Sequence, residues 1–79
     1  ALSIYPNPVL HELNINIVRE HPGLSSIAFY DAHGRQVQTF KLGYPGHQIL
    51  DLSHLDPGLY VMRILLDGEY FSSRRIIKY

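Results

Sequence analysis

The chain has 79 residues, with seven basic and seven acidic side chains and no cysteine. This length predicts a single domain, residues 1–79, and the zero net charge excludes a global field that would gather nucleic acid or an anionic membrane. Without cysteine there is neither a disulfide nor a thiolate metal site, so the apolar residues, 46% of the chain, must stabilise the fold.

The N-terminal part predicts two strands separated by a proline-rich turn. Ser3–Tyr5 is extended and runs into Pro6-Asn7-Pro8. Because proline has no N–H, we expect an edge strand followed by a rigid turn. His11–Val18 predicts a half-buried strand that precedes a loop at Glu20–Gly23. Its apolar side chains alternate with polar ones: Leu13, Ile15 and Ile17 against Glu12, Asn14 and Asn16.

The middle of the chain predicts a hairpin. Ser26–Asp31 and Gln36–Lys41 read as its strands, and Ala32-His33-Gly34 as a tight turn in which Gly34 is free to adopt a positive φ. Ile27 and Phe29 should point inward from the first strand.

A loop and a short strand lead to the longest apolar run. Leu42–Gly46 contains two glycines and a proline, which predict a loop, and His47–Leu52 predicts the short strand. The apolar run alternates, so four side chains should share one side of a strand: Tyr60, Met62, Ile64 and Leu66. A helix is disfavoured because Pro57-Gly58 precedes the run and Asp67-Gly68, which predicts a two-residue hairpin turn, follows it.

The start of this run suggests a tyrosine corner. Leu55, Gly58 and Tyr60 follow the spacing of a corner in which the tyrosine hydroxyl bonds the backbone a few residues upstream. The alternative is a buried tyrosine without that geometry.

Tyr70–Lys78 predicts the closing strand. Simple alternation gives two faces: Tyr70, Ser72, Arg74 and Ile76 against Phe71, Ser73, Arg75 and Ile77. Adjacent Ile76 and Ile77 leave the inward face ambiguous, and a bulge would change the register. With about seven short strands and no helical segment, the sequence predicts an all-β fold, an immunoglobulin-like antiparallel β-sandwich.

No residue pattern points to catalysis, a cofactor or a metal. The five histidines form no local ligand pair, so we interpret them as solvated loop residues. Ser53, His54 and Asp56 lie too close in sequence for the geometry of a nucleophilic triad. Several tyrosines offer a candidate carbohydrate platform, although packing is their commoner role in a β domain: Tyr5, Tyr30, Tyr44, Tyr70 and Tyr79.

Five blocks of residues resemble one known family. They are Tyr5-Pro6-Asn7-Pro8, Leu13-x-Ile15, Phe29-Tyr30-Asp31-x-x-Gly34-Arg35-x-Val37, Asp51-Leu52-Ser53-x-Leu55-x-x-Gly58-x-Tyr60 and Arg74-Arg75-Ile76-Ile77-Lys78. Together they span nearly the whole chain, which resembles the type A C-terminal sorting domain of the type IX (Por) secretion system. Within the first four blocks we expect these residues to be structural: Tyr5, Pro6, Asn7, Pro8, Asp31, Gly34, Leu55, Gly58 and Tyr60.

The resemblance implies a non-catalytic signal that directs an N-terminal cargo protein across the outer membrane of Gram-negative Bacteroidetes. In that family the domain folds in the periplasm, is recognised by the type IX translocon, and is normally removed by a sortase-like protease when the cargo is attached to the surface. A first residue other than Met, Ala1, agrees with a fragment of a larger secreted precursor. The alternatives are an accessory carbohydrate-binding or adhesion module of an extracellular protein, and a spacer.

The resemblance also implies that the end of the chain is read by the translocon. Carried over, the candidate residues are Arg74, Arg75, Ile76, Ile77, Lys78 and Tyr79. A terminal strand with a basic end offers backbone groups and charges to a partner, although charged edge strands also serve to prevent aggregation. A free terminal strand could pair or swap between two copies, which predicts a homodimer. Tyr79 departs from the basic or small polar last residue expected in the family.

Overall fold

A computed structural model describes residues 2–17, 25–43, 46–67 and 69–79. These residues form seven strands: β1 (Leu2–Tyr5), β2 (Glu12–Ile17), β3 (Ser25–Tyr30), β4 (Gln36–Gly43), β5 (Gly46–Asp51), β6 (Gly58–Leu66) and β7 (Glu69–Lys78). In the part of the chain that is described, no helix has the length and apolar character needed to cross a bilayer.

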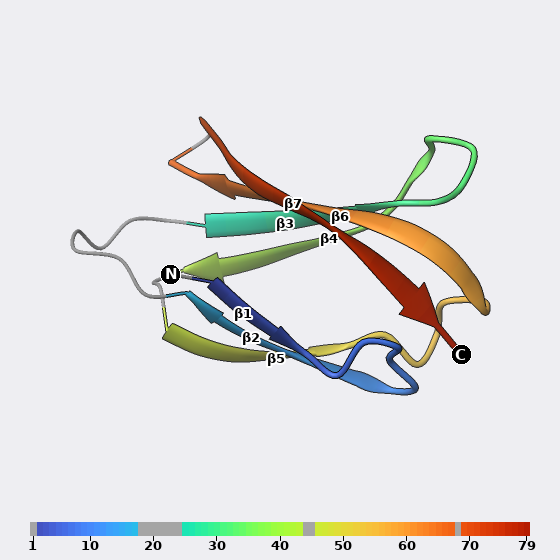
Figure 1. The fold of residues 1–79 in the computed structure, drawn as a ribbon. Helices are drawn as coiled ribbons and strands as arrows, with labels where there is room; N and C mark the ends of the chain where they lie inside the picture. Colours follow the sequence, from blue (N-terminus) through green and yellow to red (C-terminus); the bar gives the residue numbers. More distant parts are fainter. Residues whose placement is uncertain (1, 18–24, 44–45, 68) are drawn as a thin grey trace.

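The strands build two sheets packed face to face (Figure 1). One sheet has three strands in the order β1-β2-β5, and the other has four in the order β4-β3-β6-β7. Every pairing of neighbouring strands is antiparallel. The predicted antiparallel β-sandwich is confirmed. The fourth strand pairs with the third, whereas in a constant-type immunoglobulin domain it joins the sheet of the first strand.

Several predicted strand boundaries differ from the structure by one or two residues, and two of them, around β5, have a clear physical reason. The expected loop Leu42–Gly46 is shorter, because Leu42 packs against the core and Gly46 pairs with Ile17 of β2. The strand that begins at Gly46 ends one residue before Leu52, whose fully buried side chain turns into the core while its N–H donates to the His11 carbonyl oxygen at 2.7 Å. Four predicted features lie outside the described residues: the loop Glu20–Gly23, the strand end at Val18, Tyr44 and Gly68.

The core lies between the two sheets and follows the alternation of the strands. In β2 the three apolar residues are buried and the polar ones between them are not, as predicted. Ile27 and Phe29 of β3 are also fully buried, and the Phe29 ring meets Phe40 of β4 edge to face, with centroids 5.9 Å apart. The predicted inward side of β6 is confirmed, since all four of its residues are buried: Tyr60, Met62, Ile64 and Leu66. A single hydrophobic core therefore connects both sheets.

A bulge sets the register of β7. Ile64 of β6 lies opposite Ser72, but the next residue, Leu65, lies opposite Tyr70, so β7 carries one extra residue at that point. Directly opposed residues of an antiparallel pair lie on the same face. Tyr70 is therefore on the outer face, and its predicted grouping with Ser72 and Ile76 is wrong.

The β5–β6 connection is a tyrosine corner. The Tyr60 hydroxyl donates a 2.6 Å hydrogen bond to the carbonyl oxygen of Asp56, four residues upstream. Leu55 packs its side chain into the core beside it, and Gly58 has a φ of +155°, which residues with a side chain rarely adopt. Burial raises the pKa of the Tyr60 hydroxyl. The predicted corner is confirmed.

We expect Tyr60→Phe to lower the free energy of unfolding by about 1–3 kcal/mol, because it leaves the Asp56 carbonyl without its partner. The pKa of Tyr60 is raised in the folded state, so the contribution of its neutral hydroxyl is complete below the unfolded pKa of about 10 and is lost as the pH rises beyond it. Urea unfolding from pH 7 to 11 should show the difference between wild type and variant shrinking above pH 10.

Tyr30→Phe is the matched control, since the Tyr30 hydroxyl makes only an exposed 3.3 Å bond to Gln36 Oε1. A loss below about 0.3 kcal/mol for Tyr60→Phe would contradict a stabilising corner, given the usual cost of a lost hydrogen bond.

Candidate functional site

The terminal strand β7 forms one edge of the four-stranded sheet and divides its side chains between two faces. Ile76 lies opposite the buried Tyr60 and is itself only 1% exposed, whereas Ile77 lies opposite Leu59 and is 45% exposed. Ile76 is therefore the inward residue of the pair that the sequence left ambiguous. Alternation places Arg74 and Lys78 on the inner side with Ile76, and Arg75 on the outer side with Ile77.

The segment that follows β1 leaves the three-stranded sheet and joins the outer edge of β7. We call residues 6–9 the N-terminal clip. Two of its residues make the contacts. The Asn7 side chain donates from Nδ2 to the Arg75 carbonyl oxygen and accepts from the Ile77 N–H with Oδ1, both at 3.0 Å. The peptide bonds that precede Pro6 and Pro8 are both cis.

Val9 continues this contact along the strand. Its N–H donates to the Ile77 carbonyl oxygen at 2.8 Å, and its carbonyl oxygen accepts from the Tyr79 N–H at 2.9 Å, in a parallel bridge. The Val9 side chain is fully buried in the core. The outward backbone groups from the Arg75 carbonyl to the Tyr79 N–H are thus bonded within the chain, and a partner could pair with them only by displacing the clip.

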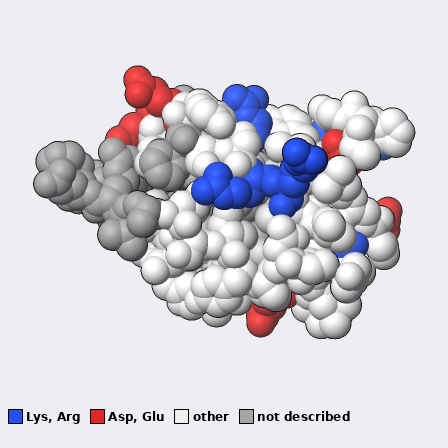
Figure 2. Space-filling view, viewed as in Figure 1, with Lys and Arg blue, Asp and Glu red and all other residues white. Residues whose placement is uncertain are grey.

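The side chains at the end of β7 differ in solvent exposure and in their hydrogen bonds. Lys78 is only 5% exposed and donates from Nζ to the Tyr79 backbone oxygen at 2.6 Å. Arg74 is held by bonds to Ser72 Oγ and to the Ser73 carbonyl oxygen. Arg75 is exposed, and the Tyr79 side chain is 65% exposed. Figure 2 shows Lys and Arg side chains gathered over β7 in the middle of the view, with acidic side chains towards its rim.

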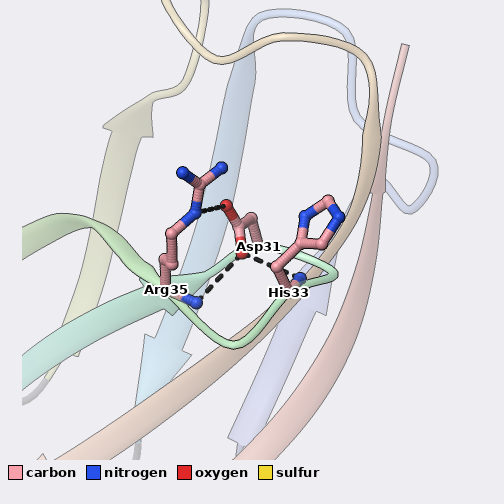
Figure 3. Close-up of polar contacts among 3 residues, drawn as sticks. All are labelled: Asp31, His33 and Arg35. Atoms are coloured by element: carbon pink, nitrogen blue, oxygen red, sulfur yellow. Dashed lines mark hydrogen bonds and ion pairs between the residues drawn. The ribbon is translucent and has the colours of Figure 1, made fainter.

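The β3–β4 turn is organised by Asp31 (Figure 3). Its Oδ1 accepts the backbone N–H groups of His33 and Arg35, and its Oδ2 accepts Nε of Arg35 at 3.0 Å. The Gly34 N–H donates to the Asp31 carbonyl oxygen, and Gly34 has the positive φ, 82°, that the sequence predicted. The hydrogen bonds to the Asp31 carboxyl, of which that from the Arg35 backbone N–H is the largest cause, lower its pKa.

A second aspartate, Asp51, starts the β5–β6 connection in the same way. Its Oδ1 accepts the Ser53 N–H at 2.9 Å, and hydrogen bonds from the side chain and backbone of Ser53 lower the pKa of Asp51. The next two apolar residues, Leu52 and Leu55, turn into the core. Within this part of the fourth sequence block, Asp51 bonds the start of the connection and the two leucines anchor it to the core. The connection then ends in the tyrosine corner.

Four of the five sequence blocks meet at one end of the sandwich. The N-terminal clip, the Asp31 turn, the β5–β6 connection and the end of β7 all lie at the end where the C-terminus is found (Figure 1). Bonds join two of these segments directly, since Asn7 and Val9 hold β7. These contacts give the first and last blocks a shared structural role, which the sequence did not reveal.

The other candidate groups do not assemble into a reactive site. Among the described residues, no cluster of three or more His, Cys, Asp or Glu side chains is arranged to hold a metal ion. His54 Nε2 lies 2.7 Å from Gln38 Oε1 of β4, and among the described residues no hydrogen bond joins it to Ser53 or Asp56.

The exposed tyrosines are divided between the sheets rather than gathered on one platform. Tyr5 stacks with His47 on the outer side of the three-stranded sheet, with ring centroids 6.4 Å apart. Tyr30 and Tyr70 lie on the outer side of the four-stranded sheet.

Comparison with protein families identifies a family for this chain. The model of the secretion system C-terminal sorting domain, the type IX family, matches residues 3–78, nearly the whole chain. No curated protein matches the chain in sequence.

We expect Asn7→Ala to lower the free energy of unfolding by about 1–3 kcal/mol, because it removes two hydrogen bonds and leaves the Ile77 N–H without an acceptor. Hydrogen exchange should accelerate at the Ile77 amide. Asn16→Ala is the control, since it is the same change at an asparagine that is more buried than Asn7 but whose side chain makes no hydrogen bond in the described structure. Unchanged exchange at Ile77 would contradict the role given to the clip.

We expect Asp31→Ala to weaken the dependence of stability on acid pH. The pKa of Asp31 is lowered in the folded state, so its contribution is complete above the unfolded value of 3.8 and is lost as the pH falls below it. Wild type and variant should therefore converge in thermal stability between about pH 4 and pH 2. Asp31→Asn, which keeps an acceptor oxygen but does not titrate, should flatten the acid limb with a smaller loss at pH 7. Parallel curves for wild type and both variants would show that Asp31 does not carry this linkage.

Proposed function

The chain belongs to the family of secretion system C-terminal sorting domains, and from this membership we propose how it acts within the type IX pathway. The family assigns it the role of a sorting signal for a secreted or cell-surface protein, exported across the outer membrane in Gram-negative Bacteroidetes. Such a signal is linked to an N-terminal cargo and to the type IX machinery. The domains of this family are in general non-catalytic.

The proposal is that the translocon reads the folded end of the sandwich, with the terminal strand as its main contact. The observation that supports it most is the match over residues 3–78. The structure supports it further, because the clip holds the last residues of β7 on a rigid sheet edge. A pre-ordered surface loses less conformational entropy on binding than a disordered tail would.

We also propose that a sortase-like protease removes the domain once the cargo reaches the surface. This step is known for the family and would give the cargo a new C-terminus. Pairing of two copies through β7 stays a prediction: a second copy would have to replace the bonds that Asn7 and Val9 make with that edge.

The test is an export assay. Residues 1–79 are fused behind a signal peptide and a fluorescent reporter in a host with a working type IX system. We expect the reporter in the medium or at the surface, shortened by about the 9.1 kDa of the domain if the protease acts. In a translocon-deficient strain it should stay in the periplasm. If the reporter stays in the periplasm of the competent strain while a known sorting domain exports it, the chain is not a sorting signal. Export without shortening would contradict the removal of the domain by the protease but not its role as a sorting signal.

A pair of exposed isoleucines tests the part played by the terminal strand. Ile77→Asp changes β7, whereas Ile49→Asp makes the same change on β5, where the side chain is 56% exposed. We expect export to fall for Ile77→Asp and to persist for Ile49→Asp. Equal export of the two variants, at equal thermal stability, would contradict recognition through β7.

A further inference from the structure

The outer side of β6 and β7 is a continuous surface. We call it the basic-apolar face. Direct opposition across the two strands places these pairs side by side: Leu59 with Ile77, Val61 with Arg75, Arg63 with Ser73, and Leu65 with Tyr70.

Apolar side chains on this face are unusually exposed. Leu59 and Ile77 are each 45% exposed and lie directly opposite one another, and Tyr70 is 59% exposed at the other end. Leu59, the half-buried Val61 and Ile77 form one apolar cluster, and the half-buried Leu65 forms a second with Tyr70, beyond the pair Arg63 and Ser73. Contiguous exposed apolar surface on a soluble domain usually marks an interaction site.

Two exposed arginines lie among these apolar side chains, Arg63 between Val61 and Leu65 on β6 and Arg75 opposite Val61 on β7. The Arg63 guanidinium lies over the Tyr70 ring, 5.4 Å from its centroid. No acidic residue belongs to the eight positions of the face, and among the described residues neither Arg63 nor Arg75 forms an ion pair. Their charges are therefore free for a partner.

The outer side of the three-stranded sheet has the opposite charge. Glu12 and Asp51 lie opposite each other there, and its other described positions carry no Lys or Arg: Ser3, Tyr5, Asn14, Asn16, His47 and Ile49. The zero net charge of the chain thus hides a separation of charge between the two sheets. An acidic partner is attracted to one face of the domain and repelled by the other.

The backbone edge of β7 also indicates that the end of this strand is recognised through its side chains. Asn7 and Val9 occupy its outward groups from the Arg75 carbonyl to the Tyr79 N–H. Addition of a partner strand along this stretch is blocked while the clip is in place. Along this stretch, recognition of the folded domain therefore depends on side chains that point away from the sheet.

We propose that the basic-apolar face docks a protein surface of the export machinery that presents carboxylates beside apolar side chains. This inference rests on the proposed function and specifies which part of the domain is read. Arg63 and Arg75 would pair with the carboxylates, and Leu59 with Ile77 would fill the apolar contact. Arginine and tyrosine beside apolar residues are the composition of protein–protein contacts, whereas anionic lipid surfaces are bound by clusters of about four to eight basic residues.

The test uses the export fusion with charge reversals. We expect the double variant Arg63→Glu/Arg75→Glu to reduce export at least about tenfold, the usual effect of losing central interface contacts. Lys41→Glu is the matched control, because Lys41 is an exposed basic residue of the same sheet that lies on β4, outside the eight positions of this face. It should keep export within about twofold of wild type. Thermal unfolding of each purified fusion checks folding, and Arg63→Gln/Arg75→Gln serves if the reversal unfolds.

The outcomes separate the inference from the function. Failure of the wild-type fusion to leave the periplasm would remove the sorting function itself. Export of the folded double variant at the wild-type level would overturn the docking face and leave the function intact. Equal loss for Lys41→Glu would also overturn it, because then net charge rather than this face would determine export. Co-sedimentation of wild-type fusion, but not of the double variant, with vesicles of anionic lipopolysaccharide would make the partner a lipid surface and overturn a protein partner.

Discussion

The contact between the N-terminal clip and the last strand is the constraint on which the rest depends. After β1 the chain passes from the three-stranded sheet to the four-stranded one, where Asn7 and Val9 bond the edge of β7. The chain therefore connects the two sheets at this edge by its own hydrogen bonds. A domain of 79 residues without disulfides has a small core, and an open edge on its terminal strand would fray or pair with other chains. The clip covers the last part of that edge, from Arg75 to Tyr79, and fixes the position of the end of β7.

The family's motif residues therefore act as a scaffold at one end of the molecule. Asp31 and Asp51 each gather backbone N–H groups of a turn, Tyr60 closes the corner, and Asn7 holds the terminal strand. Each of these polar groups already bonds the backbone of the domain itself. The outward side of β6 and β7 instead carries exposed apolar side chains together with Arg63 and Arg75, which form no ion pair within the described part of the chain. Stability and the proposed recognition thus depend on different residues of the domain.

The separation of charge between the two sheets orients the domain relative to a charged partner. Its basic side is the four-stranded sheet that contains the terminal strand, and its acidic side is the three-stranded sheet. A partner that carries carboxylates approaches the correct face before any close contact forms. Neither the composition nor the net charge reveals this, because both average over the two sheets.

The sequence by itself determined the fold class, the seven strands, the glycine at the positive φ of the β3–β4 turn and the tyrosine corner, because alternation and turn chemistry act over a few neighbouring residues. Only the tertiary structure decided which of Ile76 and Ile77 faces inward, since a bulge near Tyr70 shifted the register of β7. It alone revealed the clip. The Asn7 bonds join residues 68 and 70 positions apart, and no local pattern encodes a contact of that range.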